Sequence, residues 1–179
     1  MRKRLKLLYL SVFIISGLLV VVSPLFFFAA SATYVEGHIT LDTIWTLTDS
    51  PFVLSKDVIV DPGVTLTIMP GVEVRFAENF ALIVKGKLAA DGTQDKWITF
   101  TSNKEQPTAG DWNTIQFIDG TQPSTLTYCL IEYATNGATI QNSNVKIMNS
   151  EIRHNSMSAI AIENGYVEVM NNEISDSGD

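Results

Sequence analysis

The sequence has 179 residues, a formal net charge of −7 and one cysteine. This length suits one domain plus a leader. Four basic residues lie within the first six positions, so the rest carries 12 − 4 = 8 Lys+Arg against 19 Asp+Glu, a net charge of −11. We therefore expect no nucleic-acid partner, because polyanions bind basic surfaces. The single cysteine, Cys129, excludes an intrachain disulfide framework.

Residues 1–32 form an apolar leader. A basic start is followed by an apolar run from Leu7 to Ala30 and by small residues at Ala30 and Ala32. This layout is typical of a secretory signal peptide cleaved after Ala32, but the run is also long enough for a helix that anchors the chain in a membrane. Either alternative predicts that the following residues are secreted, periplasmic or on the cell surface, because the positive end stays inside.

Residues 33–57 contain Trp45 and the stretch "SPFVLSKD". We interpret them as an N-terminal cap and lead-in, because a stack of repeats needs cover on its first layer.

Short strands are predicted from Val58 onwards. The stretches "VIVDPGVTLTIMPGVEVRF" and "LIVKGKLAADGTQDKWITF" align with each other at one constant spacing. This alignment places Val60 over Val84, Val74 over Ile98 and Phe76 over Phe100. Pro-Gly and Asp-Gly dipeptides between the apolar runs indicate tight turns.

A polar stretch without periodicity, residues 101–111, interrupts this pattern. It predicts a protruding loop, the longest in the chain. The following stretch "WNTIQFIDG" is expected to return to a strand, with Ile115 and Phe117 pointing inward.

The clearest repeat lies between Ala138 and Asp179, where "VKIMNSEIRH" is followed by the matching stretch "VEVMNNEISD". Leu126 and Ile131 precede Ile147 and Ile152 at nearly the same spacing. The matched positions are Ile140/Ile162, Val145/Val167, Ile147/Val169, Asn149/Asn171 and Ile152/Ile174. Alternating apolar residues at a fixed period of about 22 residues predict an all-β fold, a parallel β-helix whose rungs stack about 4.8 Å apart. Residues 58–179 would supply roughly five such rungs.

The phrases "DPGVTLTIMPGVEVRF", "GKLAADGT", "ITFTSN", "GDW" and "LIEYA" resemble right-handed parallel β-helix proteins of the pectate-lyase-like superfamily. The resemblance covers Val58 to Asp179 and is closest to secreted and surface proteins. It implies a single-stranded solenoid. The superfamily includes lyases, hydrolases, epimerases, tailspikes, adhesins and NosD-type copper-maturation proteins, so the function stays open.

Charged residues are expected on one outer sheet. Glu132 and Arg153 fall in one column with Ser175. The resemblance implies that such a pair could be the acidic cation site and the basic group of a polysaccharide lyase. The alternative is a cross-strand ion pair in solvent, worth about 0.2–1 kcal/mol. Glu151 and Glu173 also stack, and a bound cation such as Ca²⁺ or separation in solvent would relieve their repulsion.

His154 lies between Tyr133 and Asp176 in its column. An acid–base pair with Asp176 and a plain surface histidine are the two alternatives. Asn149 and Asn171 predict a short asparagine ladder with a structural role.

Met148, Met170, His154 and Cys129 carry soft ligands suited to Cu(I), as a NosD-type protein would require. Plain packing by methionine is the alternative. Cys129 matches Ser150 and is expected in a turn rather than in the core.

Three functions therefore remain. The first is a non-catalytic extracellular or cell-surface module with a structural, adhesive or glycan-binding role, whose partners are polysaccharides or other cell-envelope components. The second is a polysaccharide lyase, hydrolase or epimerase, with Glu132, Glu151, Arg153, His154 and Glu173 as candidate residues. The third is metal handling. For a non-catalytic module, no cofactor is predicted.

The last predicted strand, around Ile174, is followed only by "SDSGD". We expect the final rung to leave unpaired strand edges and an apolar interior. The chain is then either part of a longer β-helix, or its C-terminal face is covered by a partner or by a second copy through self-association.

Overall fold

A computed structural model describes residues 31–178 and the residue pairs 14–15 and 18–19. The two pairs form short antiparallel strands, β1 (Ile14–Ile15) and β2 (Leu18–Leu19). The leader predicted over residues 1–32 otherwise lies outside the described residues, so its role stays a prediction. Among the described residues, no helix is long and apolar enough to span a membrane.

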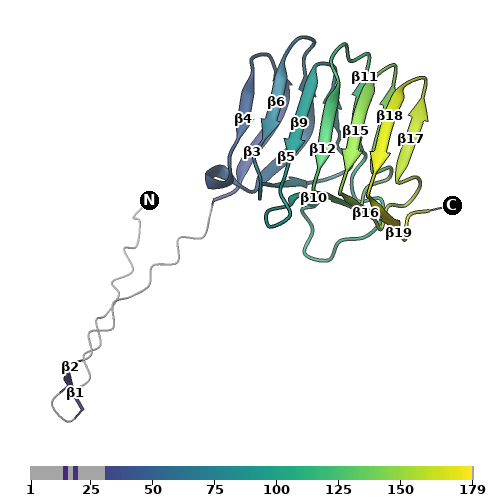
Figure 1. Cartoon of the computed structure of the whole chain (residues 1–179). Helices are drawn as coiled ribbons and strands as arrows, with labels where there is room; N and C mark the ends of the chain where they lie inside the picture. Colours follow the sequence, from purple (N-terminus) through teal and green to yellow (C-terminus); the bar gives the residue numbers. More distant parts are fainter. Residues whose placement is uncertain (1–13, 16–17, 20–30, 179) are drawn as a thin grey trace.

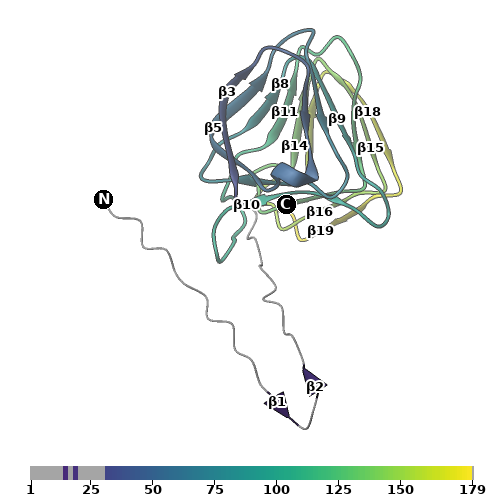
Figure 2. The ribbon, with the colours of Figure 1, turned by 90° about the vertical axis from the view of Figure 1, so that its left-hand side faces the viewer.

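The remaining strands form an all-β parallel solenoid with three faces (Figures 1 and 2). Face A comprises the first halves of β3 (Thr33–Ile39) and β5 (Phe52–Val60), then β7 (Glu73–Phe76), β10 (Ile98–Ser102), β13 (Cys129–Glu132), β16 (Glu151–Arg153) and β19 (Glu173–Ser175). Face B comprises the second halves of β3 and β5, then β8 (Leu82–Val84), β11 (Ile115–Ile118), β14 (Ala138–Gln141) and β17 (Ile160–Glu163). Face C comprises β4 (Thr43–Trp45), β6 (Thr65–Ile68), β9 (Lys87–Asp91), β12 (Ser124–Thr127), β15 (Asn144–Met148) and β18 (Tyr166–Met170).

The chain visits the faces in the order A, B, C, and one such circuit is a rung. Face C has six strands, so the solenoid has about six rungs, and β19 begins another. The first rung starts at Thr33, because β3 and β4 already pair in parallel with β5 and β6. A cap and lead-in had been predicted for this part of the chain. Between β4 and β5 lies a single turn of 3₁₀ helix, η1 (Leu47–Asp49).

The repeat found in the sequence predicts the register of the later rungs correctly. Ile140 lies opposite Ile162, Val145 opposite Val167, and Ile152 opposite Ile174. The predicted match of Val60 with Val84 is also confirmed.

The predicted register between β7 and β10 was wrong by two positions. Val74 lies opposite Phe100 rather than Ile98. The corner between β9 and β10 is longer than the sequence comparison allowed, because Thr93 and Lys96 pair with each other across an extra turn. Insertions at a corner leave the stack itself intact.

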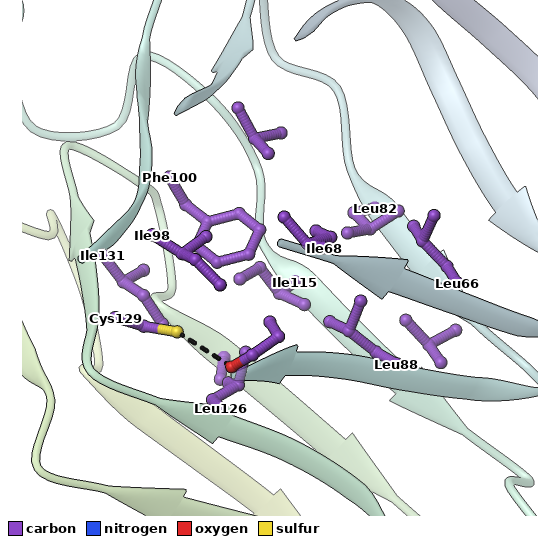
Figure 3. Close-up of a cluster of buried hydrophobic side chains, with 14 of the residues drawn as sticks. Leu66, Ile68, Leu82, Leu88, Ile98, Phe100, Ile115, Leu126, Cys129 and Ile131 are labelled. Atoms are coloured by element: carbon purple, nitrogen blue, oxygen red, sulfur yellow. Dashed lines mark hydrogen bonds between the residues drawn. The ribbon is translucent and has the colours of Figure 1, made fainter. Parts of the chain in front are cut away.

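The inward side chains form vertical columns that fill the solenoid (Figure 3). Ile131 and Ile152, for example, lie on paired strands and are both 0% exposed. Cys129 belongs to this core. The prediction that it lies in a turn was therefore wrong. The residue at the corner is Tyr128, with a φ of 49°, and the Cys129 thiol points inward, 3.5 Å from the Ala90 carbonyl oxygen.

Single residues with positive φ turn the chain at the corners of the later rungs. They include Asn142, Asn149, Asn164 and Asn171, and asparagine tolerates this conformation better than most residues. The amides also bond along the axis, Asn164 to Asn142 at 2.6 Å and Asn171 to Asn149 at 3.4 Å. The predicted asparagine ladder is thus confirmed, and a second one accompanies it.

Buried serines and asparagines directly follow these corner residues. Ser150 Oγ accepts a hydrogen bond from the Cys129 amide, and Asn155 Oδ1 accepts one from the Ala134 amide. Each bond satisfies a backbone donor of the preceding rung, which would otherwise lose its partner on burial.

Replacing Ile152 with alanine should lower the free energy of unfolding by about 2–5 kcal/mol, because the side chain is fully buried between two neighbours of its column. The same change at Ile174, which is 51% exposed, should cost far less. Chemical denaturation of both variants measures the difference. Equal losses would contradict the assigned register.

Candidate functional site

Face A brings three of the charged residues identified in the sequence into one network. Arg153 Nε donates to Glu132 Oε2 at 3.0 Å, and Arg153 Nη2 forms an ion pair with the same oxygen, also at 3.0 Å. Its Nη1 donates to Glu151 Oε1 at 2.6 Å. Thr101 Oγ1 donates to the other oxygen of Glu132 at 3.1 Å. The column predicted for Glu132, Arg153 and Ser175 is therefore confirmed.

This network is more buried than an ordinary surface ion pair. The Glu132 side chain is 12% exposed and that of Arg153 is 34% exposed. Burial opposes the charge of Arg153, but its bonds to Glu132 and Glu151 outweigh this and raise the pKa of the guanidinium. The expectation that both groups face open solvent was thus wrong for Glu132, because Thr101 and Arg153 cover it from the two neighbouring strands.

Glu151 and Glu173 lie opposite each other, as predicted. Arg153 compensates the Glu151 charge, with its Nη1 2.6 Å from Glu151 Oε1. Among the described residues, no three His, Cys, Asp or Glu side chains come close enough to hold a metal ion.

His154 lies at the corner between faces A and B. Its ring stacks on Tyr133, with centroids 5.6 Å apart, and its Nδ1 is 3.7 Å from Asp176 Oδ2. The predicted neighbours are therefore present. The Asp176 side chain is 71% exposed, so the pair lies in solvent rather than in an enclosed site.

The predicted soft-ligand residues do not meet. Met148 and Met170 stack on the outer surface of face C, whereas the Cys129 sulfur is inside the core and His154 is at another corner. The pKa of the Cys129 thiol is raised, mainly by burial, which disfavours the thiolate that a metal would need.

The polar loop predicted over residues 101–111 begins later than expected, because Thr101 and Ser102 are the last residues of β10. Asp111 closes the loop. Its carboxylate accepts hydrogen bonds from Ser102 Oγ at 2.7 Å, Lys104 Nζ at 2.6 Å and Thr108 Oγ1 at 2.8 Å. Next to it, Trp112 returns to the core and stacks on Phe76, with ring centroids 3.9 Å apart. The loop therefore leaves the stack after β10 and rejoins it at Trp112.

A polar depression of about 280 Å³ lies on the outside of face B. Amides and hydroxyls on β11 and β14 or just before them line one part of it, namely Asn113, Thr114, Gln116, Asn136, Thr139 and Gln141. The rest of the lining is Ile140 and three residues of β17, Ala161, Ile162 and Glu163. Ala161 is the small residue of this surface, in one column with Gln116 and Thr139.

The polar groups of the depression are linked to one another. Gln141 Nε2 donates to Glu163 Oε2 at 2.6 Å, and Gln116 Nε2 approaches Gln141 Oε1 at 3.5 Å. Thr114 and Thr139 hydroxyls are 3.3 Å apart. Such a surface offers several donors and acceptors at fixed positions and only one carboxylate.

This depression was not predicted, because the candidate site residues in the sequence were charged groups and soft metal ligands. The available signal was the alternation of β11, β14 and β17, which places Gln116, Thr139, Gln141 and Glu163 outward once the inward residues are assigned.

Residues 37–124 match a family model described as the pectate-lyase-like beta helix domain. These residues form a pectate-lyase-like β-helix domain. It is also similar to the protein Bark beetle of Drosophila melanogaster, with 37% identity over 62 residues. That match covers 35% of this chain and 2% of the Drosophila protein. No solved structure gives a significant match.

Asp111 should make this β-helix sensitive to acid. Burial raises the pKa of this carboxyl, but bonds from Lys104, Thr108 and Ser102 outweigh burial and lower it to about 2. Its contribution to stability, of order 2 kcal/mol, is complete above the pKa of the unfolded chain, near 3.9, and disappears as the pH falls through 2. Denaturation of wild type and Asp111→Asn between pH 6 and about 2 measures this. A constant difference between the two proteins would contradict it.

Arg153→Met should destabilise the protein by about 1–3 kcal/mol, because it leaves the largely buried Glu132 carboxylate with Thr101 as its remaining partner. Adding Glu132→Gln should recover part of that loss, since the uncompensated charge is then removed. Urea titrations of the two single variants and the double variant test the coupling. If the losses of unfolding free energy in the two single variants add up to that of the double variant, the interaction between Arg153 and Glu132 contributes nothing to stability.

Proposed function

We propose that this chain is a non-catalytic extracellular or cell-surface β-helix module that binds a neutral glycan in the face B depression. The observation that carries the proposal is the chemistry of the depression. Amides and hydroxyls on β11 and β14 and just before them line it, beside Ala161 and Glu163 of β17. Amides and hydroxyls are the groups that pair with sugar hydroxyls, which both donate and accept.

The charge of the chain supports a neutral ligand. Residues after the leader carry a net charge of −11, and the one ionised group of the depression, Glu163, is an acid. Acidic polymers such as pectate or alginate would be repelled by this surface.

The face A network supports a non-catalytic role. Glycoside hydrolysis requires a carboxylic acid with a raised pKa and a second carboxylate positioned to act on the sugar. Here Arg153 pairs with both Glu132 and Glu151, and Glu132 is largely covered. A location outside the cell follows from the leader if residues 1–32 act as a signal peptide or anchor.

The test uses a substitution that fills the depression. Ala161→Gln adds an outward side chain between Thr139 and Glu163 without touching the core. Ala89→Gln is the matched control, because Ala89 is an outward, half-buried alanine on face C.

Binding is measured on an immobilised panel of neutral glucans, mannans and galactans, with polygalacturonate and alginate as acidic comparators. We expect wild type and Ala89→Gln to bind a neutral glycan equally, and Ala161→Gln to bind it at least about tenfold more weakly, or about 1.4 kcal/mol.

Binding that survives Ala161→Gln, or binding of the acidic polymers alone, would contradict the proposed site. Turnover of a polysaccharide that is abolished by Arg153→Met would contradict the non-catalytic role and favour a lyase, hydrolase or epimerase.

A further inference from the structure

The outer surface of face B changes from apolar to polar along the solenoid axis. One outward column includes, in order, Ile59, Ile83, Gln116, Thr139 and Ala161. The last three line the depression. The two isoleucines before them are half-buried rather than fully covered. A ligand in the depression therefore lies next to an apolar surface on β5 and β8 of the same face.

A third isoleucine extends this apolar surface towards the depression. Ile118 is the half-buried residue two positions after Gln116 on β11, and it pairs with Gln141 of the depression. Because Gln116 pairs with Ile83, Ile118 is the diagonal neighbour of Ile83, with the two Cα atoms about 8 Å apart. We call Ile59, Ile83 and Ile118 the isoleucine strip.

The isoleucine strip is a feature of face B and is not repeated on face C. There the outward column of the same rungs contains Thr67, Ala89 and Thr125. Threonine is enriched in strands as isoleucine is, so the strand conformation itself does not require isoleucine on the outside. Apolar side chains beside a few polar groups are typical of sites whose ligand contributes apolar groups as well as hydrogen bonds.

Gln116 lies at the boundary between the isoleucine strip and the depression. Its side-chain amide carries two N–H donors. Within the described residues, the contact of this nitrogen with Gln141 Oε1 is 3.5 Å long, at the outer limit for a hydrogen bond. At least one donor is therefore available for a carbonyl oxygen of a ligand, at a place where a methyl group attached to that carbonyl lies on Ile83 and Ile118.

The charges around the isoleucine strip favour an uncharged group. Asp61 and Lys85 continue the column of Ile118 with opposite charges, because they directly follow the paired residues of β5 and β8. Glu163 adds a negative charge to the depression. An acetyl ester combines an uncharged methyl group with a carbonyl acceptor, whereas a methyl ether or a deoxy sugar supplies the methyl group alone.

We propose that the glycan bound in the face B depression is O-acetylated. Its acetyl methyl groups lie on the isoleucine strip, and an acetyl carbonyl oxygen accepts a hydrogen bond from the Gln116 amide. This inference rests on the proposed function and adds to it the chemical class of the glycan.

The test compares matched glycans with and without acetyl groups. Soluble oligosaccharides of glucomannan and of xylan are titrated into the full chain, each in its partly O-acetylated form and after removal of the acetyl groups by mild alkali. We expect the acetylated form of at least one of them to have a dissociation constant at least about threefold lower than its deacetylated form. This is the effect of burying about one methyl group.

The double variant Ile83→Thr, Ile118→Thr keeps β-branched side chains but removes most of the apolar surface. We expect the ratio of the two dissociation constants to fall to about one, while binding of the deacetylated form stays unchanged. Leu130→Thr is the matched control, because Leu130 is an outward, half-buried leucine on face A, and it should keep the ratio of the wild type. Circular dichroism checks that each variant is folded. If the double variant does not fold, Ile83→Thr alone should lower the ratio.

The other outcomes overturn the inference in ways that can be told apart. Equal binding of both forms by the wild type, with binding still weakened by Ala161→Gln, would remove the acetyl group and leave the proposed function standing. An unchanged ratio in the folded strip variant would place the acetyl contact elsewhere. A wild type that binds neither form of any neutral glycan would overturn the proposed function as well. Self-association of the wild type that the strip variant abolishes would show that a second copy covers the strip instead.

Discussion

The vertical stacking of inward side chains is the constraint on which the rest of this structure depends. Each strand forms hydrogen bonds with the equivalent strands of the rungs above and below it. A side chain in the core therefore contacts the equivalent side chains of those two rungs. A slip of one residue would turn every inward side chain outward. The contrast between Ile152, fully buried, and Ile174, half exposed in the same column, shows how much one neighbouring rung contributes to burial.

Variation is consequently confined to the corners and the outer surfaces. The loop that begins after Ser102 leaves the stack at a corner, and Asp111 and Trp112 bring the chain back into register. The outer surfaces are free to differ, and they do. Face A carries a charge-compensated ion network around Arg153, whereas face B carries the polar depression beside Ala161.

Much of the fold could be predicted from the sequence, because the fold is a repeat. The regular spacing of the last rungs predicted the pairing of Ile140 with Ile162 and of Ile152 with Ile174. The spacing failed between Val74 and Phe100, where a longer corner hides the true register. Cys129 was misplaced because the corner is a single residue, Tyr128, and the chain points inward again directly after it.

The candidate site was harder to predict than the fold. The column of Glu132 and Arg153 followed from the repeat, but the cover that Thr101 provides depends on the longer step from β10 to β13, which interrupts the repeat. The face B depression depends on the small side chain of Ala161, which lies between larger polar side chains. Side-chain size on an outer surface leaves no periodic signal in the sequence.

The most direct test of this account is to measure methyl–methyl nuclear Overhauser contacts among the isoleucines of the later rungs. The stacked columns predict contacts of Ile152 with both Ile131 and Ile174, and of Ile140 with Ile162. They also predict that a soluble paramagnetic agent broadens the methyl signals of Ile174 and Ile162 but not those of Ile152 and Ile140. Equal broadening of Ile152 and Ile174, without a contact between Ile131 and Ile152, would contradict the stacked solenoid.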